Sequence, residues 1–241
     1  FGSLSFIHHK EEKFIMKLKK LMALALSGVL AVSMFAGCAK GNVKPEPTPD
    51  PEEPTATGYS VTLGDKVDVE KDYITYQDNA DDAAALQDAL GNMASVSVAA
   101  NATLPQTVME FDKSKVFGDS ELVIDDFVNA LDIENNNLYL WAMHDSLVYD
   151  ADWKADDTVK YGVLYVIDGT VDVNKALAQV ADEIKDTIRD LPNVNHGTVA
   201  RYTYDYTVSA SVVNKALEPF AGYTLSANFI AVTITRVPTA A

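Results

Sequence analysis

The chain has 241 residues, of which 19 are Lys or Arg and 35 are Asp or Glu, so its formal net charge is −16 at pH 7. So acidic a surface repels phosphate backbones and anionic headgroups, which argues against nucleic-acid binding and against electrostatic binding to a membrane. The single cysteine excludes a disulfide framework within the chain, and an apolar content of 48% is enough for an ordinary core.

The first fifteen residues match neither a signal nor a domain, and they precede a methionine, Met16, that begins an export signal. Lys10-Glu11-Glu12 could be encoded by AAGGAGGAA, which contains a ribosome-binding sequence upstream of Met16. We therefore predict that residues 1–15 are untranslated leader read in frame. A strong site of this kind is typical of a Gram-positive source.

The export signal spans residues 16–37. The basic stretch Met16-Lys17-Leu18-Lys19-Lys20 is followed by an uncharged, mostly apolar run from Leu21 to Gly37. This order predicts a cleaved signal rather than a membrane span. The end of the run, Ala36-Gly37-Cys38, resembles the lipobox of bacterial lipoproteins, although Phe35 stands where Leu is usual. The resemblance implies cleavage before Cys38 and attachment of lipid, including palmitate, to this residue.

Cleavage would leave a mature chain of 204 residues that starts at Cys38. The removed residues contain five Lys and two Glu, so 14 basic and 33 acidic residues remain and the formal net charge becomes −19. With Cys38 lipidated, the mature chain has no thiol nucleophile. The lipid would hold the protein at the extracytoplasmic face of the cell membrane, because a chain so acidic does not bind there electrostatically.

Residues 38–58 comprise the lipidated cysteine and a linker. Five of the nine prolines lie between residues 39 and 58, interleaved with Glu, Asp and Thr. Proline excludes this segment from a helix or a central strand. We predict a polyproline-like spacer that reaches up to about 60 Å at about 3.1 Å per residue and lifts a domain off the membrane. The alternative is a Pro-x-Pro ligand for a binding module.

Residues 59–241 alternate between strand and helix patterns and form the predicted extracytoplasmic domain. In its first part the patterns predict strands over 60–63, 72–77, 95–100, 107–111, 138–144 and 146–149, and helices over 80–93 and 120–131. Asp78 or Asn79 would cap the first of these helices, and the second would bury Leu122 and Phe127.

The second part of the domain has clearer patterns. Val159–Ile167 is apolar on both faces, which predicts a central strand. Apolar residues at spacings of three and four predict a helix over 173–191, which Pro192 would end. Alternation over 202–209 predicts a half-buried strand, 214–222 a helical turn, and 225–237 a final strand.

This order predicts an α+β fold, a mainly antiparallel sheet with helices packed on it. Weak internal sequence similarities, between stretches 104 and 101 residues apart, suggest two related β-α-β-β halves over residues 59–150 and 157–241. One similarity pairs 66–71 with 170–175, and another pairs Ala80-Asp81-Asp82 with Ala181-Asp182-Glu183.

Motifs for catalysis are not found. The sequence has no G-x-S-x-G elbow, phosphate-binding or dinucleotide-binding glycine motif, or H-E-x-x-H, so we predict no catalytic residue and no cofactor. His144-Asp145-Ser146 has the residue types of a hydrolytic triad, but adjacent residues on a predicted strand point to opposite faces. A carboxylate-dependent hydrolase of envelope or dietary polymers stays as an alternative.

A candidate cation site lies in the acidic stretch that contains Asp150, Asp152 and Asp156. It departs from a calcium-binding EF-hand loop because Lys154 and Ala155 fall at the fifth and sixth positions. An irregular calcium site and a solvated loop are the two interpretations.

Four aromatic residues in the same region are the other candidates for binding. Tyr139, Trp141, Tyr149 and Trp153 lie close together in the sequence, beside Asp and Asn residues. Exposed rings of this kind hold sugar rings by stacking, whereas packing in the core is the alternative. We therefore expect a lipid-anchored, non-enzymatic binding or accessory domain whose ligand is a glycan, a peptide or a cation. A structural subunit that presents strand 225–237 as an exposed edge is a further alternative.

Overall fold

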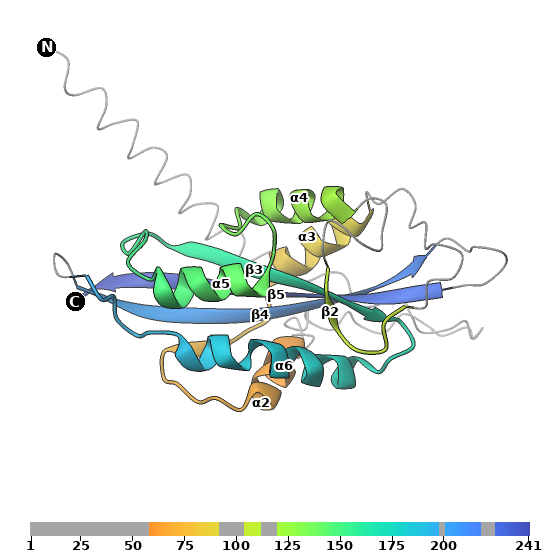
Figure 1. The fold of residues 1–241 in the computed structure, drawn as a ribbon, viewed down its shortest axis with the longest axis horizontal. Coiled ribbons are helices and arrows are strands. Elements are labelled where there is room, and N and C mark those ends of the chain that lie inside the picture. Colours follow the sequence, from red (N-terminus) through yellow and green to blue (C-terminus); the bar gives the residue numbers. More distant parts are fainter. Residues whose placement is uncertain (1–57, 92–103, 112–119, 198–200, 218–224) are drawn as a thin grey trace, which may run out of the picture. The chain divides into compact units, whose positions relative to one another are not determined.

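The computed structural model describes residues 58–91, 104–111, 120–197, 201–217 and 225–241, all within one compact unit, Ala56–Ala241. In these residues the strands are β1 (Ile74–Tyr76), β2 (Met109–Glu110), β3 (Val159–Asp168), β4 (Tyr202–Leu217) and β5 (Leu225–Ala240). The helices are α2 (Tyr59–Val67), α3 (Ala80–Gly91), α4 (Ser120–Leu131), α5 (Leu140–His144), the π-helix η1 (Asp145–Tyr149) and α6 (Val173–Asp190) (Figure 1).

The described strands form one sheet in the order β1-β4-β5-β3-β2. β1 pairs with β4 in parallel, and the other pairs are antiparallel. The predicted α+β class, a mainly antiparallel sheet with helices packed on it, is therefore confirmed. β3 lies between β5 and β2, in agreement with the central strand that its apolar pattern predicts.

Alternation along the long strands divides the hydrophobic core in two. In β5, Ile230, Val232 and Ile234 are buried on one face of the sheet, whereas Phe229 and Ala231 are buried on the other. Successive side chains of a strand point to opposite faces, so both faces of β5 are apolar. Each apolar face needs a covering layer to exclude water.

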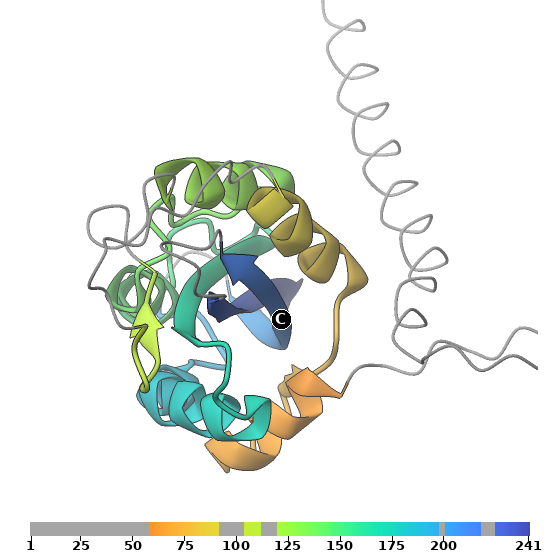
Figure 2. The same ribbon diagram turned by 90° about the vertical axis from the view of Figure 1, so that its right-hand side faces the viewer.

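Helices supply both layers, and Figure 2 shows α3 and α4 on one side of the sheet and α2 and α6 on the other. α2, α5, η1 and α6 contribute to the core on the Ile230 face, and α3 and α4 contribute to the core on the Phe229 face. None of the helices in the described ranges is long and apolar enough to cross a membrane.

Two neighbouring residues fix the starts of two helices. The Oδ1 atom of Asn79 accepts the backbone N–H groups of Asp81 at 2.9 Å and Asp82 at 3.4 Å, so Asn79 caps α3. The carboxylate of Asp78 instead accepts the N–H groups of Gly58 at 2.7 Å and Ser60 at 2.9 Å, at the start of α2.

Helix α6 agrees closely with the sequence prediction. The Oδ1 atom of Asp172 accepts the N–H group of Lys175 at 3.1 Å and caps the first turn. Leu177 and Ile184 are fully buried on the inner face of the helix, and Pro192 follows its end.

Three predicted strands are wrong. Residues 60–63 belong to α2, and residues 138–144 and 146–149 contribute α5 and η1. Val, Thr, Tyr and Trp favour strands, but packing overrides this preference. Leu63 and Val67 are spaced by four residues and both fully buried, and so are Met143 and Leu147. A helix puts such a pair on one face.

Two predictions, one about the burial of a side chain and one about the place of a strand in the sheet, are also wrong. Leu122 is 55% exposed, and Ile124 is buried in its place. The strand expected as a possible exposed edge, β5, lies between β4 and β3, so the edges of the described sheet are the short strands β1 and β2. Of the predicted turn over 214–222, residues 214–217 extend β4 and the rest lie outside the described residues, as does the predicted strand over 95–100.

The suggested halves contribute to one sheet, because β1 and β2 from the first half flank β3, β4 and β5 from the second. The similar residues also occupy different places in their helices. Ala80-Asp81-Asp82 begins α3, whereas Ala181-Asp182-Glu183 lies inside α6.

Candidate ligand-binding surface

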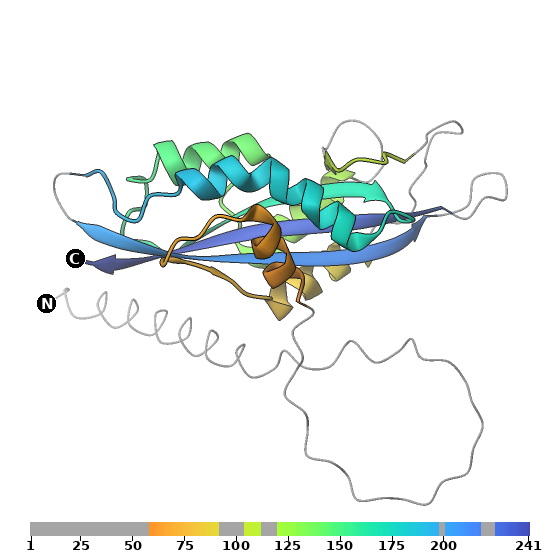
Figure 3. The same ribbon diagram turned by 90° about the horizontal axis from the view of Figure 1, so that it is seen from below.

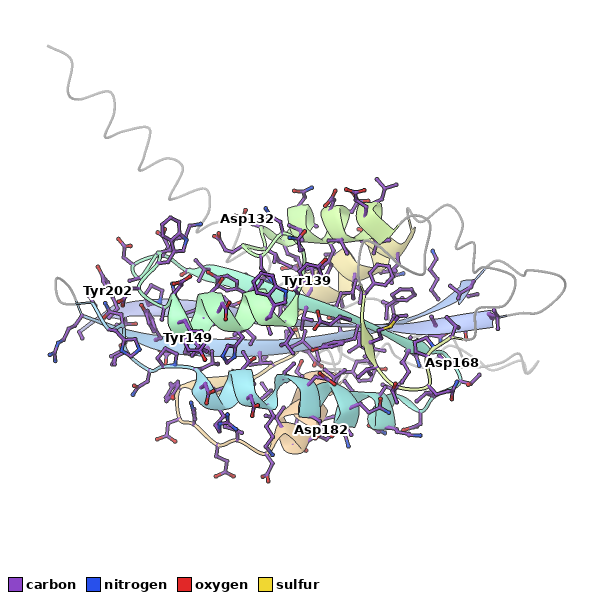
Figure 4. All side chains as sticks on the ribbon, viewed as in Figure 1. Asp132, Tyr139, Tyr149, Asp168, Asp182 and Tyr202 are labelled. Atoms are coloured by element: carbon purple, nitrogen blue, oxygen red, sulfur yellow. The ribbon has the colours of Figure 1, made fainter. Side chains whose placement is uncertain are left out.

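The four aromatic residues predicted to bind a ligand lie on one continuous segment, residues 139–153. Tyr139 is the N-cap residue of α5, Trp141 lies on α5, Tyr149 ends η1, and Trp153 lies in the following turn. Trp141, Tyr149 and Trp153 are 64%, 73% and 65% exposed. Figure 4 shows Tyr139 and Tyr149 towards opposite ends of this helical stretch. We name the three exposed side chains the aromatic surface.

Such exposure is concentrated in this segment. Of the eight large hydrophobic side chains that are exposed in the described residues, three form the aromatic surface. The other five are distributed over α2, β2, α4, β5 and the segment after α6 (Val61, Met109, Leu122, Val237 and Val194). Single exposed apolar residues are ordinary, but three large aromatic side chains exposed within thirteen residues offer several ring faces to a ligand.

Buried contacts fix the helical part of the segment. Met143 of α5 and Leu147 of η1 are fully buried in the core on the α6 side of the sheet. Nδ1 of His144 lies 3.2 Å from Oγ1 of Thr187 on α6, and Figure 3 shows α5 beside α6. The ring of His144 contacts Tyr149 edge-on, with centroids 5.3 Å apart. His144 thus links the two helices and orients Tyr149.

A buried arginine fixes the turn that carries Trp153. Arg236 on β5 is 0% exposed. Its Nη1 donates to the carbonyl of Ala151 at 2.9 Å, and its Nη2 donates to the carbonyls of Trp153 at 3.0 Å and Lys154 at 2.8 Å. The guanidinium also lies over the ring of Tyr204, 4.6 Å from the ring centroid. Carbonyl dipoles and an aromatic face therefore compensate the buried charge.

Further hydrogen bonds hold the same turn. The hydroxyl of Tyr204 donates to the carbonyl of Ala151 at 2.9 Å. Burial raises the pKa of Tyr204, although the guanidinium of Arg236 opposes the shift, so the hydroxyl keeps the proton that it donates. Nζ of Lys154 pairs with Oε1 of Glu134 at 2.5 Å, and this hydrogen bond raises the pKa of Lys154.

Unusual backbone conformations also gather here. Four non-glycine residues of the described chain have positive φ, and two of them, Leu138 and Lys154, flank this segment directly. Each left-handed residue costs about 1–2 kcal/mol. The π-helix η1 lies in the same segment, and both features are enriched at functional sites. The fold therefore maintains a costly conformation where the aromatic rings are exposed.

The acidic stretch has a structural role in this arrangement. Oδ1 of Asp152 accepts the N–H groups of His196 at 2.8 Å and Gly197 at 2.9 Å. Within the described ranges, no three His, Cys, Asp or Glu side chains gather as metal ligands would, and Asp150 and Asp156 are exposed. Three backbone carbonyls of this stretch instead bind the guanidinium of Arg236, a cation that the chain itself supplies.

Comparison with known proteins gives no relatives for this surface. No family model matches the chain, and no curated protein and no solved structure is significantly similar to it. The assignment of the surface therefore depends on its residues and their geometry.

Arg236 is the residue of this site that sequence reasoning missed. It is separated by more than 80 residues from each carbonyl that it binds. The one available signal is the alternation of side chains along β5. Arg236 has the same orientation as Ile234 and Val232, two and four residues earlier, and so points into the core.

Proposed function

We propose that this chain is a lipid-anchored, extracytoplasmic protein of the bacterial envelope whose domain binds a ligand without catalysing a reaction. The observation that carries the proposal is the exposure of Trp141, Tyr149 and Trp153 on a backbone held by buried contacts. Rings that are already fixed lose little conformational freedom on binding, so more of the contact energy contributes to affinity.

The proposed anchor is supported by sequence. Ala36-Gly37-Cys38 ends an apolar run that follows a basic start, and a proline-rich, acidic segment comes next. These residues lie outside the described ranges. The domain itself is acidic, so lipid is the means of attachment that fits its charge.

Metabolic labelling with palmitate tests the anchor. We expect label on the chain in expressing bacteria and none on the Cys38→Ser variant, which should be released or left unprocessed. Asn42→Ser, a change in the linker, is the control and should keep the label. Label that persists on the Cys38→Ser variant would contradict the anchor.

Co-sedimentation with cell-wall sacculi of the expressing bacterium tests the binding surface. The chain as expressed, extracted in a non-ionic detergent, should sediment with the sacculi. The double variant Trp141→Ala/Trp153→Ala should bind at least about tenfold more weakly, as expected when central aromatic contacts are removed.

The matched control for this experiment is Val61→Ala/Leu122→Ala, which removes two exposed apolar side chains from α2 and α4. It should bind as the unchanged chain does. Equal binding by all three proteins, or equal loss in both double variants, would contradict the proposed surface.

A further inference from the structure

The charges around the aromatic surface restrict its ligand. Residues 144–157 include five exposed carboxylates (Asp145, Asp150, Asp152, Asp156 and Asp157). The two basic residues of this stretch are engaged, His144 with Thr187 and Lys154 with Glu134. An anionic ligand would therefore meet uncompensated negative charge, which excludes teichoic-acid-like phosphate polymers and nucleic acid by repulsion.

The geometry of the rings argues against a cationic ligand. Aromatic cages that recognise quaternary ammonium ligands enclose the cation between several ring faces. The planes of Tyr139 and Trp141 instead lie 20° apart with centroids 6.2 Å apart, so these rings stack on each other. Trp141 and Trp153 are each about two-thirds exposed, which leaves ring surface open to solvent. Such rings are platforms for a flat ligand.

The backbone of the segment argues against an extended peptide. Residues 140–149 are helical, and the described edges of the sheet are β1 and β2, which are other elements. The sheet edge nearest this segment is β2, whose Glu110 side chain accepts the N–H group of Leu140 at 3.4 Å, and its two paired residues offer an added strand few hydrogen bonds. Carboxylates such as Asp145 and Asp150, by contrast, can accept hydrogen bonds from hydroxyl groups beside the rings.

We infer that the ligand of the aromatic surface is an uncharged, hydroxyl-rich polysaccharide. The rings of Trp141 and Trp153 stack on the apolar faces of its sugar units, and neighbouring carboxylates accept its hydroxyl groups. This inference rests on the proposed function of the surface and names the class of its ligand.

Affinity electrophoresis with matched polymers tests the inference. The chain, extracted in a non-ionic detergent, is run through gels that contain hydroxyethylcellulose, carboxymethylcellulose or quaternised hydroxyethylcellulose. These polymers share a backbone and are neutral, anionic and cationic. The same three forms of amylose, of dextran and of a β-1,3-glucan extend the test to other linkages.

We expect retardation by at least one neutral polymer and less retardation by its anionic form. The apparent Kd should change by less than about twofold when the salt concentration rises from about 0.1 M to about 1 M, because no ion pair is involved. Trp141→Ala and Trp153→Ala should each raise this Kd about tenfold, whereas Leu122→Ala should leave it unchanged.

Two results would overturn the inference: no retardation by any neutral polymer, or retardation by cationic polymers alone that is lost at high salt. Either result leaves the proposed function standing if the tryptophan double variant still loses binding to sacculi. If that variant binds sacculi normally, the proposed function fails instead.

Discussion

Two buried tyrosines on the α6 side of the sheet show how single hydroxyl groups contribute to stability. The hydroxyl of Tyr206 donates to the carbonyl of Pro192 at 2.8 Å. The hydroxyl of Tyr165 is buried and has no hydrogen-bond partner among the described residues. Burial raises the pKa of both side chains, so both stay protonated. A buried hydroxyl without a partner costs free energy, whereas a paired one contributes to stability.

Replacement of each tyrosine by phenylalanine should therefore have opposite effects. We expect Tyr165→Phe to raise the free energy of unfolding by up to about 1 kcal/mol, and Tyr206→Phe to lower it by about 1–2 kcal/mol. Chemical denaturation followed by circular dichroism measures both changes. A loss of stability in Tyr165→Phe would show that its hydroxyl has a partner in solution.

For single residues, the sequence indicates the aromatic side chains of the site but not the buried residues that fix their backbone. Trp141, Tyr149 and Trp153 attract attention by residue type and proximity alone. Their exposure depends on Met143, Leu147 and other buried residues, which no local pattern reveals. The charge of Asp152 predicts a cation ligand, yet the described hydrogen bonds of its carboxylate are to the backbone N–H groups of residues 196 and 197.

At the scale of elements, the turn over residues 150–157 depends on Arg236. Arg236→Met would remove all three hydrogen bonds to the carbonyls of Ala151, Trp153 and Lys154. We expect Arg236→Met to lower the free energy of unfolding by about 3 kcal/mol. Arg236→Lys should lower it by less, because lysine keeps the charge but lacks the planar guanidinium that donates to several carbonyls. Hydrogen exchange should become faster first at residues 150–157.

The control for this prediction is Arg189→Met on α6. Arg189 is more than half exposed and pairs with Asp186 and Asp190 on its own helix. Its replacement should leave both the stability and the exchange at residues 150–157 unchanged. If Arg236→Met has as little effect as Arg189→Met, the turn does not depend on the guanidinium.

Elements with complete local signals were predictable, and elements defined by distant contacts were not. α6 has an N-cap, an apolar face and a proline after its end, so its bounds follow from sequence. α2 is capped by Asp78, about twenty residues further along the chain, and its strand-like residues gave the wrong prediction. The central place of β5 depends on strand order, which periodicity does not determine.

For the whole molecule, buried phenols predict sensitivity to alkali. Burial raises the pKa of Tyr76 from 10.0 to about 12 and also raises the pKa values of Tyr165 and Tyr206. In the unfolded chain these groups lose their protons near pH 10, whereas the folded chain retains them. The folded state therefore binds more protons above this pH, and its stability falls as the pH rises.

Thermal unfolding at increasing pH checks this prediction. The midpoint should be steady up to about pH 10 and fall between about pH 10 and about pH 12. Phenolate absorbance should show the buried tyrosines Tyr76, Tyr165 and Tyr206 ionising only as the chain unfolds. Ionisation of every tyrosine near pH 10 while the chain stays folded would contradict the burial of these rings.

Tryptophan fluorescence tests most directly whether the aromatic surface is open and binds a ligand. Both tryptophans of the chain belong to this surface, so intrinsic tryptophan fluorescence reports on it alone. The free chain should emit at the long wavelengths of water-exposed indoles. Titration with soluble, uncharged glycan fragments from the cell wall of the expressing bacterium should shift this emission to shorter wavelengths and saturate. Emission typical of buried indoles in the free chain, or no change at any fragment concentration, would contradict the account.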